Sequence, residues 1–410
     1  MKIWNIHVGE PNSFINTVNR DRIGRANSLS FLLAKNGHDV THFGGHFSHV
    51  RRDFEPVYPN TKLASAVSGL SYVLLGSSGY KKNISFARIW DHCQLAVSFY
   101  KFLKKADEIP DLIVVSVPTI ELAFAVSIYA KIKRIRVIVD FRDLWPEIFL
   151  YHYIKNQKIV VRFLNRLLPW YWMNRFIFRN SSMITTVGEG FASYVVDTYL
   201  REKHRKKVIT IYQSQKNCTS VRIRKNHSMF RFLWTGNIVA ETDFYTLKEA
   251  IKKLAKDGRK FEVWIAGNGS VIHGEKEFFS EYSRNIKILG WLNADQLSKA
   301  IDSCDIGLLC YLDRVDFRMA IQNKVIDYLR QGLPIIGSIN GELRRLDETE
   351  GTNIYKLYEF GDVNSLVNVM EECIQQGISY MQRRNCIELF DNYFSFTSVQ
   401  EQWLDIVNGE

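Results

Sequence analysis

Residues 112–140 read LIVVSVPTIELAFAVSIYAKIKRIRVIVD, and this stretch decides the fold class. It begins with an apolar run of strand length (112–116), continues with a helical segment (119–133) and ends in a second apolar run (136–140). A strand, a helix and a second strand of these lengths form a unit in which the two strands lie parallel. The sequence therefore predicts an α/β fold built on a parallel sheet.

The same alternation continues towards both ends of the chain, in two runs separated by a polar stretch (213–229). The further strands are expected at 2–8, 39–43, 182–187, 207–212, 230–235, 261–267, 286–290, 305–310, 333–337 and 353–358, with helices between them at about 22–36, 244–257, 294 onwards, 323–331 and 363–376. Two runs of similar length predict two doubly wound domains facing a central cleft. In such sheets ligands bind beyond the carboxyl ends of the strands. We expect an N-terminal domain over 1–212, a C-terminal domain over 213–385 and a C-terminal helix over 386–410.

The composition excludes several classes of protein. Among 410 residues, 46% are hydrophobic and 24% are charged, which is typical of a globular chain and not of a disordered one. The six cysteines form no C-x-x-C pair, which argues against a zinc ribbon, an iron–sulfur cluster or a disulfide scaffold and suits a reducing cytosol. The start, MKIWNIHVGEPN, has no signal-peptide core, and no apolar run is long enough to span a membrane. We therefore expect a cytoplasmic protein that is soluble or lies on a membrane surface.

The net charge of +11 points to nucleic acid, an anionic membrane or a phosphate-bearing substrate as a partner. A basic aromatic stretch (148–180) bears on the choice, because residues 148–188 contain no acid. Its basic and apolar members are Lys155, Lys158, Arg162, Arg166, Arg175, Arg179, Phe163, Leu167, Leu168, Trp170, Tyr171, Trp172, Phe176 and Phe178. The stretch is either a buried helix with a solvated basic face or an interfacial element that faces anionic lipid. No nucleic-acid module accompanies it, so nucleic acid is not the expected partner.

Several catalytic motifs are absent from the sequence. The first strand is not followed by G-x-G-x-x-G, and no G-x-x-x-x-G-K-[ST], G-x-S-x-G or H-E-x-x-H occurs. Their absence disfavours dinucleotide-dependent dehydrogenases, P-loop ATPases, α/β-hydrolases and zinc peptidases. The ten histidines show no metal-ligand spacing, so no metal site is expected.

The most informative stretch is DFRMAIQNKVIDYLRQGLPII (316–336). Asn323 is expected to cap a helix, with Lys324 in its first turn and Asp327 one turn further on. A lysine in a first helical turn, beside a loop arginine (Arg318), forms an anion site through charge and the helix dipole. The carboxylate of Asp327 could accept hydrogen bonds from ribose hydroxyls. The alternative is an exposed i,i+3 ion pair, worth only about 0.2–0.5 kcal/mol.

A second stretch, DFRDLWPEIF (140–149), follows a predicted strand directly. Asp140, Arg142 and Asp143 are expected in a loop at the carboxyl end of that strand, where they would contact substrate. Alternatively, Arg142 and Asp143 pair with neighbours and only brace the loop.

The two stretches together resemble family-4 glycosyltransferases of the GT-B fold, a retaining, nucleotide-sugar-dependent class of bacterial surface-polysaccharide clusters. The resemblance covers nearly the whole chain. It includes RIGRANSLSFLLAKNGHDVT (22–41), GYKKNISFARIWDH (79–92), PDLIVVSVPTIELA (110–123), WTGNIVAETDFYTLKEA (234–250) and the later Gly361-Asp362. It implies an N-terminal acceptor domain, a C-terminal donor domain and a last helix that crosses back to the first domain.

The resemblance also implies roles for individual residues. Arg318 and Lys324 would hold the diphosphate and carry catalysis, Asp327 would bind the donor ribose, and Asn323 starts the helix that carries them. Gly236 and Asn237 would approach the phosphates, and Gly267, Asn268, Gly269, Trp291 and Leu292 would line the base. On the acceptor side are Arg22, Gly24 and Arg25 in the first loop, with Arg142 and Asp143.

The sequence departs from the family pattern at three points. Met319 replaces the first of two glutamates, and the loop from Gly236 to Asp243 has no basic residue. Ser116 and Pro118 stand where relatives often have a histidine. In the front-face mechanism proposed for this class, the leaving phosphate accepts the acceptor's proton, so neither a metal, a cofactor nor a general base is expected.

The expected function is sugar transfer from a nucleotide-sugar to a lipid-linked or other glycan acceptor, at the inner face of the cell membrane. A nucleotide-sugar epimerase of the same fold and a non-catalytic membrane-surface scaffold are the alternatives. The epimerase makes no use of the basic aromatic stretch, and the scaffold makes no use of the Arg318, Lys324 and Asp327 group.

Overall fold

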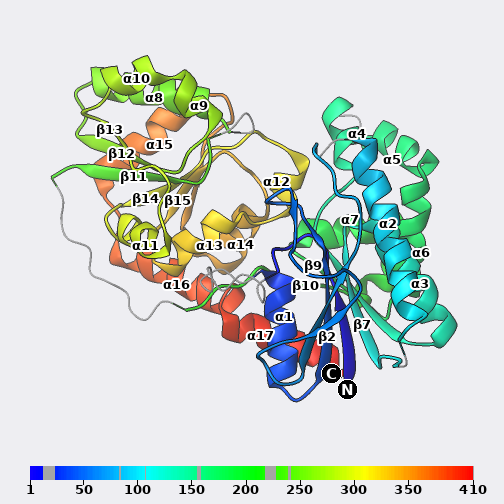
Figure 1. Cartoon of the computed structure of the whole chain (residues 1–410). Coiled ribbons are helices and arrows are strands. Elements are labelled where there is room, and N and C mark those ends of the chain that lie inside the picture. Colours follow the sequence, from blue (N-terminus) through cyan, green and yellow to red (C-terminus); the bar gives the residue numbers. More distant parts are fainter. Residues whose placement is uncertain are drawn as a thin grey trace. The chain divides into compact units, whose positions relative to one another are not determined.

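The computed structural model describes residues 1–12, 24–82, 85–106, 108–154, 158–217, 228–238 and 242–409. The chain divides into two compact units. The N-terminal unit comprises Met1–Ile211 and Gln400–Glu410, and the C-terminal unit comprises Tyr212–Val399. Each unit has its own twisted sheet with helices packed on it (Figure 1).

The sheet of the N-terminal unit has the strand order β10-β9-β8-β7-β1-β2-β6-β5. Its strands are β1 (Lys2–Ile6), β2 (Asp39–Gly45), β5 (Lys62–Ala64), β6 (Leu70–Leu75), β7 (Leu112–Val117), β8 (Arg136–Phe141), β9 (Met183–Thr186) and β10 (Val208–Thr210), and all run parallel except β5. A short hairpin, β3 (Phe47–Ser48) and β4 (Asp53–Phe54), stands apart from this sheet. The stretch 112–140 forms β7, a helix and β8, as predicted. The order reverses at β1, because the chain first extends the sheet towards β2 and later returns to β7 on the other side.

The helices of this unit are α1 (Arg25–Lys35), α2 (Phe86–Leu103), α3 (Ile120–Lys133), α4 (Ile148–Tyr153), α5 (Lys158–Leu167), α6 (Pro169–Asn180), α7 (Glu189–Tyr199) and the 3₁₀ helix η1 (Glu202–Lys207). The helices α2, α3 and α6 pack side by side (Figure 1). None of the helices in the described ranges is long and apolar enough to cross a membrane.

The basic aromatic stretch (148–180) folds into α4, α5 and α6, and its aromatic residues divide between the core and the surface. Tyr171 and Phe178 of α6 are buried, whereas Phe163, Leu167 and Trp172 are exposed. Lys155 and the side chains of Lys158 and Arg162 lie outside the described residues. Only part of this stretch is therefore available to a membrane.

The sheet of the C-terminal unit has the order β13-β12-β11-β14-β15-β16, and all its strands are parallel. They are β11 (Phe230–Thr235), β12 (Phe261–Ala266), β13 (Ile286–Ile288), β14 (Ile306–Leu309), β15 (Ile335–Gly337) and β16 (Tyr355–Leu357). The helices are α8 (Phe244–Lys256), α9 (Ser270–Gly274), α10 (Lys276–Glu281), α11 (Ala294–Asp302), α12 (Val315–Met319), α13 (Asn323–Arg330), α14 (Glu342–Glu350) and α15 (Val363–Gln376). The predicted strands of this run all form.

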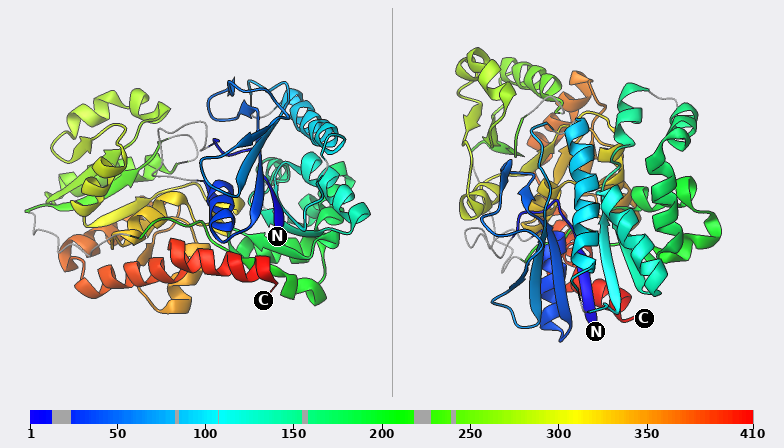
Figure 2. Two further views of the ribbon diagram at one scale, coloured as in Figure 1. Left: turned by 60° about the horizontal axis from the view of Figure 1, so that its bottom comes forward. Right: turned by 45° about the vertical axis from the view of Figure 1, so that its right-hand side comes forward.

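The end of the chain forms two helices, α16 (Tyr380–Tyr393) and α17 (Phe396–Asn408), instead of one helix over 386–410. Ser379 caps α16 with a reciprocal capping box to Gln382, which is why that helix begins before residue 386. The last part of α17, from Gln400 onwards, belongs to the N-terminal unit. There the guanidinium of Arg136, at the start of β8, donates a hydrogen bond of 2.8 Å to the carbonyl of Val407. Figure 2 shows α17 in red, ending at the C-terminus.

Candidate functional site

Helix α13 begins one residue earlier than predicted. Its N-cap is Gln322, in an extended conformation, and Asn323 is the first helical residue, with an exposed side chain. The Gln322 amide donates hydrogen bonds to the carbonyls of Phe317 and Ala320 and not to the helix. The prediction that Asn323 caps α13 was therefore wrong, whereas Lys324 does lie in the first turn.

Tyr328 fastens α13 to the end of β11. Its hydroxyl accepts hydrogen bonds of 3.0 Å from the backbone N–H and the side chain of Thr235, and donates one of 3.1 Å to the carbonyl of Leu233. Its ring lies against Gly307 of β14, where a Cβ would be 2.5 Å from the ring. This anchoring places Lys324, one turn earlier, at the carboxyl end of β11.

The ammonium group of Lys324 lies in an aromatic cage formed by Trp234 and Tyr311. Nζ is 4.0 Å from the ring centroid of Trp234 and 4.8 Å from that of Tyr311. Its Cε lies 3.8 Å from the position that a Cβ on Gly236 would take. Nζ is buried, and no described group hydrogen-bonds to it. A buried ammonium without an acceptor is costly, and cation–π contacts offset only part of that cost.

Burial lowers the pKa of Lys324 to about 7. The nearby phenol and thiol stay neutral, because burial raises the pKa of Tyr311 and that of Cys310 to about 12. An anion bound next to Gly236 would raise the pKa of Lys324 and so favour its protonated, positively charged form.

Arg318 does not lie in a loop as expected, because it belongs to the short helix α12. Its guanidinium forms a two-pronged ion pair with Asp313, and this hydrogen bonding raises the pKa of Arg318. Gly341 lies against the backbone of Arg318, since a Cβ there would be 2.5 Å from the Arg318 carbonyl oxygen. Of the two predicted cations, Lys324 is thus the one without a hydrogen-bonded anion.

Close contacts between two loops require glycine at the positions that were expected to approach the donor. A Cβ on Gly267 would lie 2.1 Å from the carbonyl oxygen of Gly236, and one on Gly269 would lie 2.0 Å from that of Ile238. The N–H of Ile238 also donates to the carbonyl of Asn268 at 2.8 Å. The loops after β11 and β12 are therefore held together through their backbones, and the side chains of Asn237 and Asn268 are left exposed.

The remaining residues predicted for the donor site lie on two elements. Trp291 and Leu292 follow β13, with Trp291 exposed and Leu292 packed partly against the core. Asp327 is buried on α13, between Lys324 and Tyr328.

The N-terminal unit contains a cavity of about 260 Å³ at the carboxyl ends of β1, β2, β6, β7 and β8. This position is where the strand order reverses, and ligands of doubly wound sheets bind at such points. Its polar lining includes His7, Glu10, Tyr80, Arg88, His92 and Arg142. Asp143 also lines it, so both Arg142 and Asp143 reach the cavity for which they were predicted.

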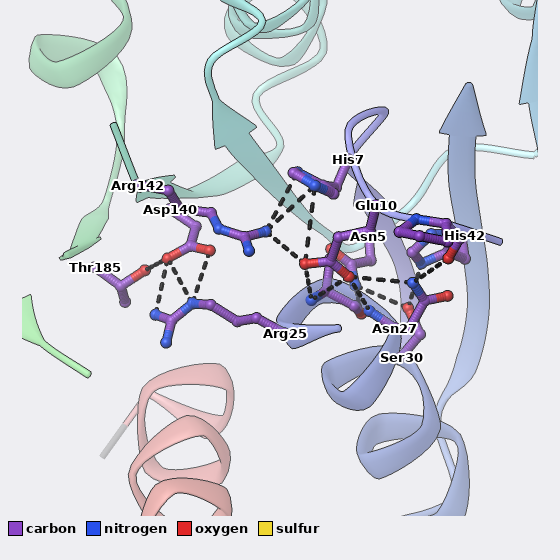
Figure 3. Close-up of polar contacts among 12 residues, drawn as sticks. Asn5, His7, Glu10, Arg25, Asn27, Ser30, His42, Asp140, Arg142 and Thr185 are labelled. Carbon is purple, nitrogen blue, oxygen red and sulfur yellow. Dashed lines mark hydrogen bonds and ion pairs between the residues drawn. The ribbon is translucent and has the colours of Figure 1, made fainter. Parts of the chain in front are cut away.

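Glu10, which the sequence analysis missed, connects three segments around this cavity. Its carboxylate accepts hydrogen bonds of 3.1 and 3.2 Å from the backbone N–H groups of Ala26 and Asn27, at the start of α1. It also accepts a hydrogen bond of 2.7 Å from Arg142, which follows β8 (Figure 3). Burial alone would raise the pKa of Glu10, but Arg142 and these hydrogen bonds hold it well below its usual range. Glu10 is therefore an ionised, fully engaged carboxylate.

His7 lies beside the same pair of charges. Its Nε2 is 3.3 Å from the guanidinium of Arg142 and 3.8 Å from the carboxylate of Glu10 (Figure 3). Burial, reinforced by the charge of Arg142, lowers the pKa of His7 to about 3. The ring is thus neutral at physiological pH and can accept or donate a hydrogen bond in the cavity.

Arg25, predicted on the acceptor side, has a structural position instead. Its side chain is buried and pairs with Asp140 through three hydrogen bonds of 2.9 to 3.2 Å, and it also donates to the carbonyl of Ile211 at 2.8 Å. Neither Arg25 nor Asp140 lines the cavity. Gly24 packs against the carboxylate of Glu10, and Arg22 lies outside the described residues.

Helix α2 supplies cavity residues that the sequence analysis did not single out, although GYKKNISFARIWDH contains them. Arg88, Asp91 and His92 project into the lining at helical spacing. The guanidinium of Arg88 lies 3.9 Å from the ring centroid of Trp145 and donates to His92 at 3.4 Å. Over the described ranges, no three His, Cys, Asp or Glu side chains are grouped as ligands of a metal would be.

Residues 230–376, from β11 to α15, match the model of a family described as glycosyl transferases group 1. No curated protein sequence matches the chain.

Solved structures match over the whole length of the chain. Sucrose-phosphate synthase from Thermosynechococcus elongatus has a TM-score of 0.69 and 12% identity, over 100% of this chain and 98% of that one. The lipopolysaccharide outer core galactosyltransferase WaaB, in its apo form, has a TM-score of 0.64 and 14% identity, over 100% and 99%. Anabaena HepE in complex with UDP has a TM-score of 0.62 and 12% identity, over 100% of both chains. The chain as a whole has the GT-B fold, and its residues 230–376 are similar to the group 1 glycosyltransferase domain.

Proposed function

We propose that this protein is a retaining glycosyltransferase of family 4. It would transfer a sugar from a nucleotide-sugar to a lipid-linked or other glycan acceptor in bacterial surface-polysaccharide synthesis. The observation that carries the proposal is Lys324, whose buried ammonium at the carboxyl end of β11 has no hydrogen-bonding partner among the described residues.

A nucleoside diphosphate fits this position chemically. Its negative charge increases as the sugar–phosphate bond breaks, and a preorganised cation next to the first turn of α13 stabilises that charge. Gly236 has a φ of +90° and lies next to Lys324, so the chain there approaches a ligand with backbone alone. Lys324 takes the role that a basic residue in the Gly236–Asp243 loop would otherwise have, and Asp327 would bind the ribose.

The cavity of the N-terminal unit suits the acceptor. Three carboxylates line it, those of Glu10, Asp91 and Asp143. Glu10 is committed to α1 and Arg142, so Glu10 does not serve as a general base. In a retaining front-face transfer, the acceptor's proton passes to the leaving phosphate oxygen, and the new glycosidic bond forms on the face that the diphosphate leaves. His7, Arg88 and His92 would orient the acceptor by hydrogen bonds.

The comparisons support this proposal in general terms. Among the similar structures are complexes of HepE with UDP and with UDP-glucose, and WaaB is a lipopolysaccharide outer core galactosyltransferase. The net charge of +11 and the exposed Phe163, Leu167 and Trp172 agree with an enzyme that works at the inner face of the cell membrane.

The decisive experiment incubates the protein with a panel of nucleotide-sugars and measures release of nucleoside diphosphate. We expect release with at least one donor, and much less release by Lys324→Met. Binding of a nucleotide-sugar followed by isomerisation, without diphosphate release in the presence of any glycan acceptor, would identify an epimerase instead. An inverted anomeric configuration of the product, determined by NMR, would contradict the retaining assignment.

A further inference from the structure

Helix α2 has two contrasting faces. Asp91, His92 and Leu95 are turned inward and line the cavity of the N-terminal unit. On its opposite side, Phe86 is 91% exposed and Trp90 is 64% exposed. The helix that lines the proposed acceptor cavity therefore also presents large apolar side chains to solvent.

The exposed apolar residues share one side of the helix and form a stripe along it. Phe86, Trp90, Val97 and Tyr100 are all exposed, and at 100° per residue they lie within about 80° of one another around the helix axis. Such a stripe along several turns differs from the isolated apolar residues found on most protein surfaces. It needs a partner that offers apolar surface.

The exposed charges directly before α2 and at its end are positive, and the exposed acid that follows them, Glu108, pairs with Lys2 and Lys62. Lys81 and Lys82 are exposed just before α2, and Lys101, Lys104 and Lys105 are exposed at its end. The only acid on the helix, Asp91, is buried. The ammonium of Lys104 lies 4.9 Å from the ring centroid of Tyr100, which joins the basic cluster to the stripe.

We propose that the outer face of α2 docks on an anionic lipid bilayer. Phe86, Trp90, Val97 and Tyr100 enter the interface, and the lysines at both ends of the helix contact anionic headgroups. Tryptophan and tyrosine favour this depth, because one end of the ring is apolar and the other hydrogen-bonds to water. The proposal rests on the proposed function in one respect, since it places the acceptor cavity directly beside the lipid that carries the acceptor.

A second copy of the chain fits this face poorly. Two copies packed through the stripe, in either direction, would bring lysine clusters together without an exposed acid on α2 to neutralise them. An anionic bilayer supplies both the apolar layer and the opposite charge.

The test compares binding of three proteins to vesicles of phosphatidylcholine with phosphatidylglycerol, measured by flotation. Phe86→Ser/Trp90→Ser should bind at least about tenfold more weakly than the wild type, because two large apolar side chains no longer enter the interface. Tyr245→Ser/Tyr380→Ser, at two other exposed aromatic positions, both in the C-terminal unit, should bind like the wild type. Both variants should keep the wild-type thermal unfolding curve, since all four side chains are exposed.

Three outcomes would overturn the proposal: no binding of the wild type to these vesicles, equal binding by the Phe86→Ser/Trp90→Ser variant, or a dimer that this variant abolishes. Release of diphosphate from a soluble donor is measured in parallel. Retained release with lost vesicle binding supports the docking face, whereas vesicle binding without any release contradicts only the proposed function.

Discussion

The carboxylate of Glu10 occupies the space beside the Cα of Gly24, where a Cβ would lie 2.2 Å from Oε2. Only a residue without a side chain lets this carboxylate reach the N–H groups of Ala26 and Asn27 while it also holds Arg142. The loop after β1, the start of α1 and the loop after β8 therefore meet at one carboxylate.

We expect Gly24→Ala to displace Glu10 from the start of α1. The backbone itself tolerates alanine, because Gly24 has a φ of −62°, so the effect comes from crowding alone. Overpacking of this kind costs about 1–3 kcal/mol, measurable by chemical denaturation. Gly274→Ala is the matched control, because no atom lies within 4 Å of a Cβ there. Equal stability of the two variants would mean that Glu10 moves without cost.

Lys324→Ala should lower the turnover number by about 10²–10³, the effect of losing one preorganised electrostatic group at a developing charge. The measurement is the initial rate of diphosphate release at saturating donor. Lys248→Ala, which removes a lysine already paired with Glu275 in the same unit, should leave the rate unchanged. A turnover of Lys324→Ala near that of the wild type would refute the donor-site assignment.

Arg318→Ala should lower turnover less than Lys324→Ala does. Asp313 already pairs with the guanidinium of Arg318, so a diphosphate must compete with that carboxylate. For the same reason Asp313→Asn should tighten binding of nucleoside diphosphate, measured by titration calorimetry. A larger loss from Arg318→Ala than from Lys324→Ala would exchange the roles of the two residues.

The free energy of unfolding should fall as pH rises from about 4.5 to about 7. In this range Glu147 keeps its proton in the folded protein and loses it in the unfolded chain. Burial raises the pKa of Glu147 from an ordinary value near 4.5 to about 7, although hydrogen bonding to Tyr199 opposes this. Between these values the unfolded chain releases the proton and the folded chain keeps it. Each unit of pH then costs at most about 1.4 kcal/mol of the free energy of unfolding. Glu147→Gln should remove this pH dependence in urea denaturation, and Glu401→Gln, at an exposed position, should not.

Turnover should survive removal of divalent cations. The charge that develops on the leaving diphosphate is assigned to Lys324 and the first turn of α13, so EDTA should leave the rate of diphosphate release unchanged. A loss that magnesium or manganese restores would show that a metal carries this charge.

Most strands that are compact apolar runs could be predicted from sequence, as in 112–140 and in the C-terminal unit, but β6, an equally apolar run, was not predicted. Helix α2 was missed for a physical reason. Its exposed face carries Phe86, Trp90 and Val97 while its buried face carries Leu95 and Phe99, so the hydrophobic pattern lacks a polar side. A periodicity search recognises a helix by the contrast between two faces, and here that contrast is weak.

The candidate site was predicted only where it is local in sequence. Lys324 was found because a first helical turn is visible in the sequence, but its aromatic partners Trp234 and Tyr311 come from two other segments and only tertiary packing brings them together. Glu10 and His7 escaped notice for the same reason. A signal was present, since His7 directly follows β1 and Glu10 lies in the loop after it, where ligands of doubly wound sheets bind.

The division of α17 has a consequence for synthesis of the chain. The N-terminal unit is completed by residues from Gln400 onwards, which the ribosome adds only after the whole C-terminal unit. Until then Arg136 lacks the carbonyl of Val407, and Arg25 lacks the ring of Trp403, which lies 5.1 Å from its guanidinium in the finished protein. The first unit to emerge is therefore the last to be finished, and a nascent chain arrested near residue 399 should display an N-terminal unit that proteases cleave more readily.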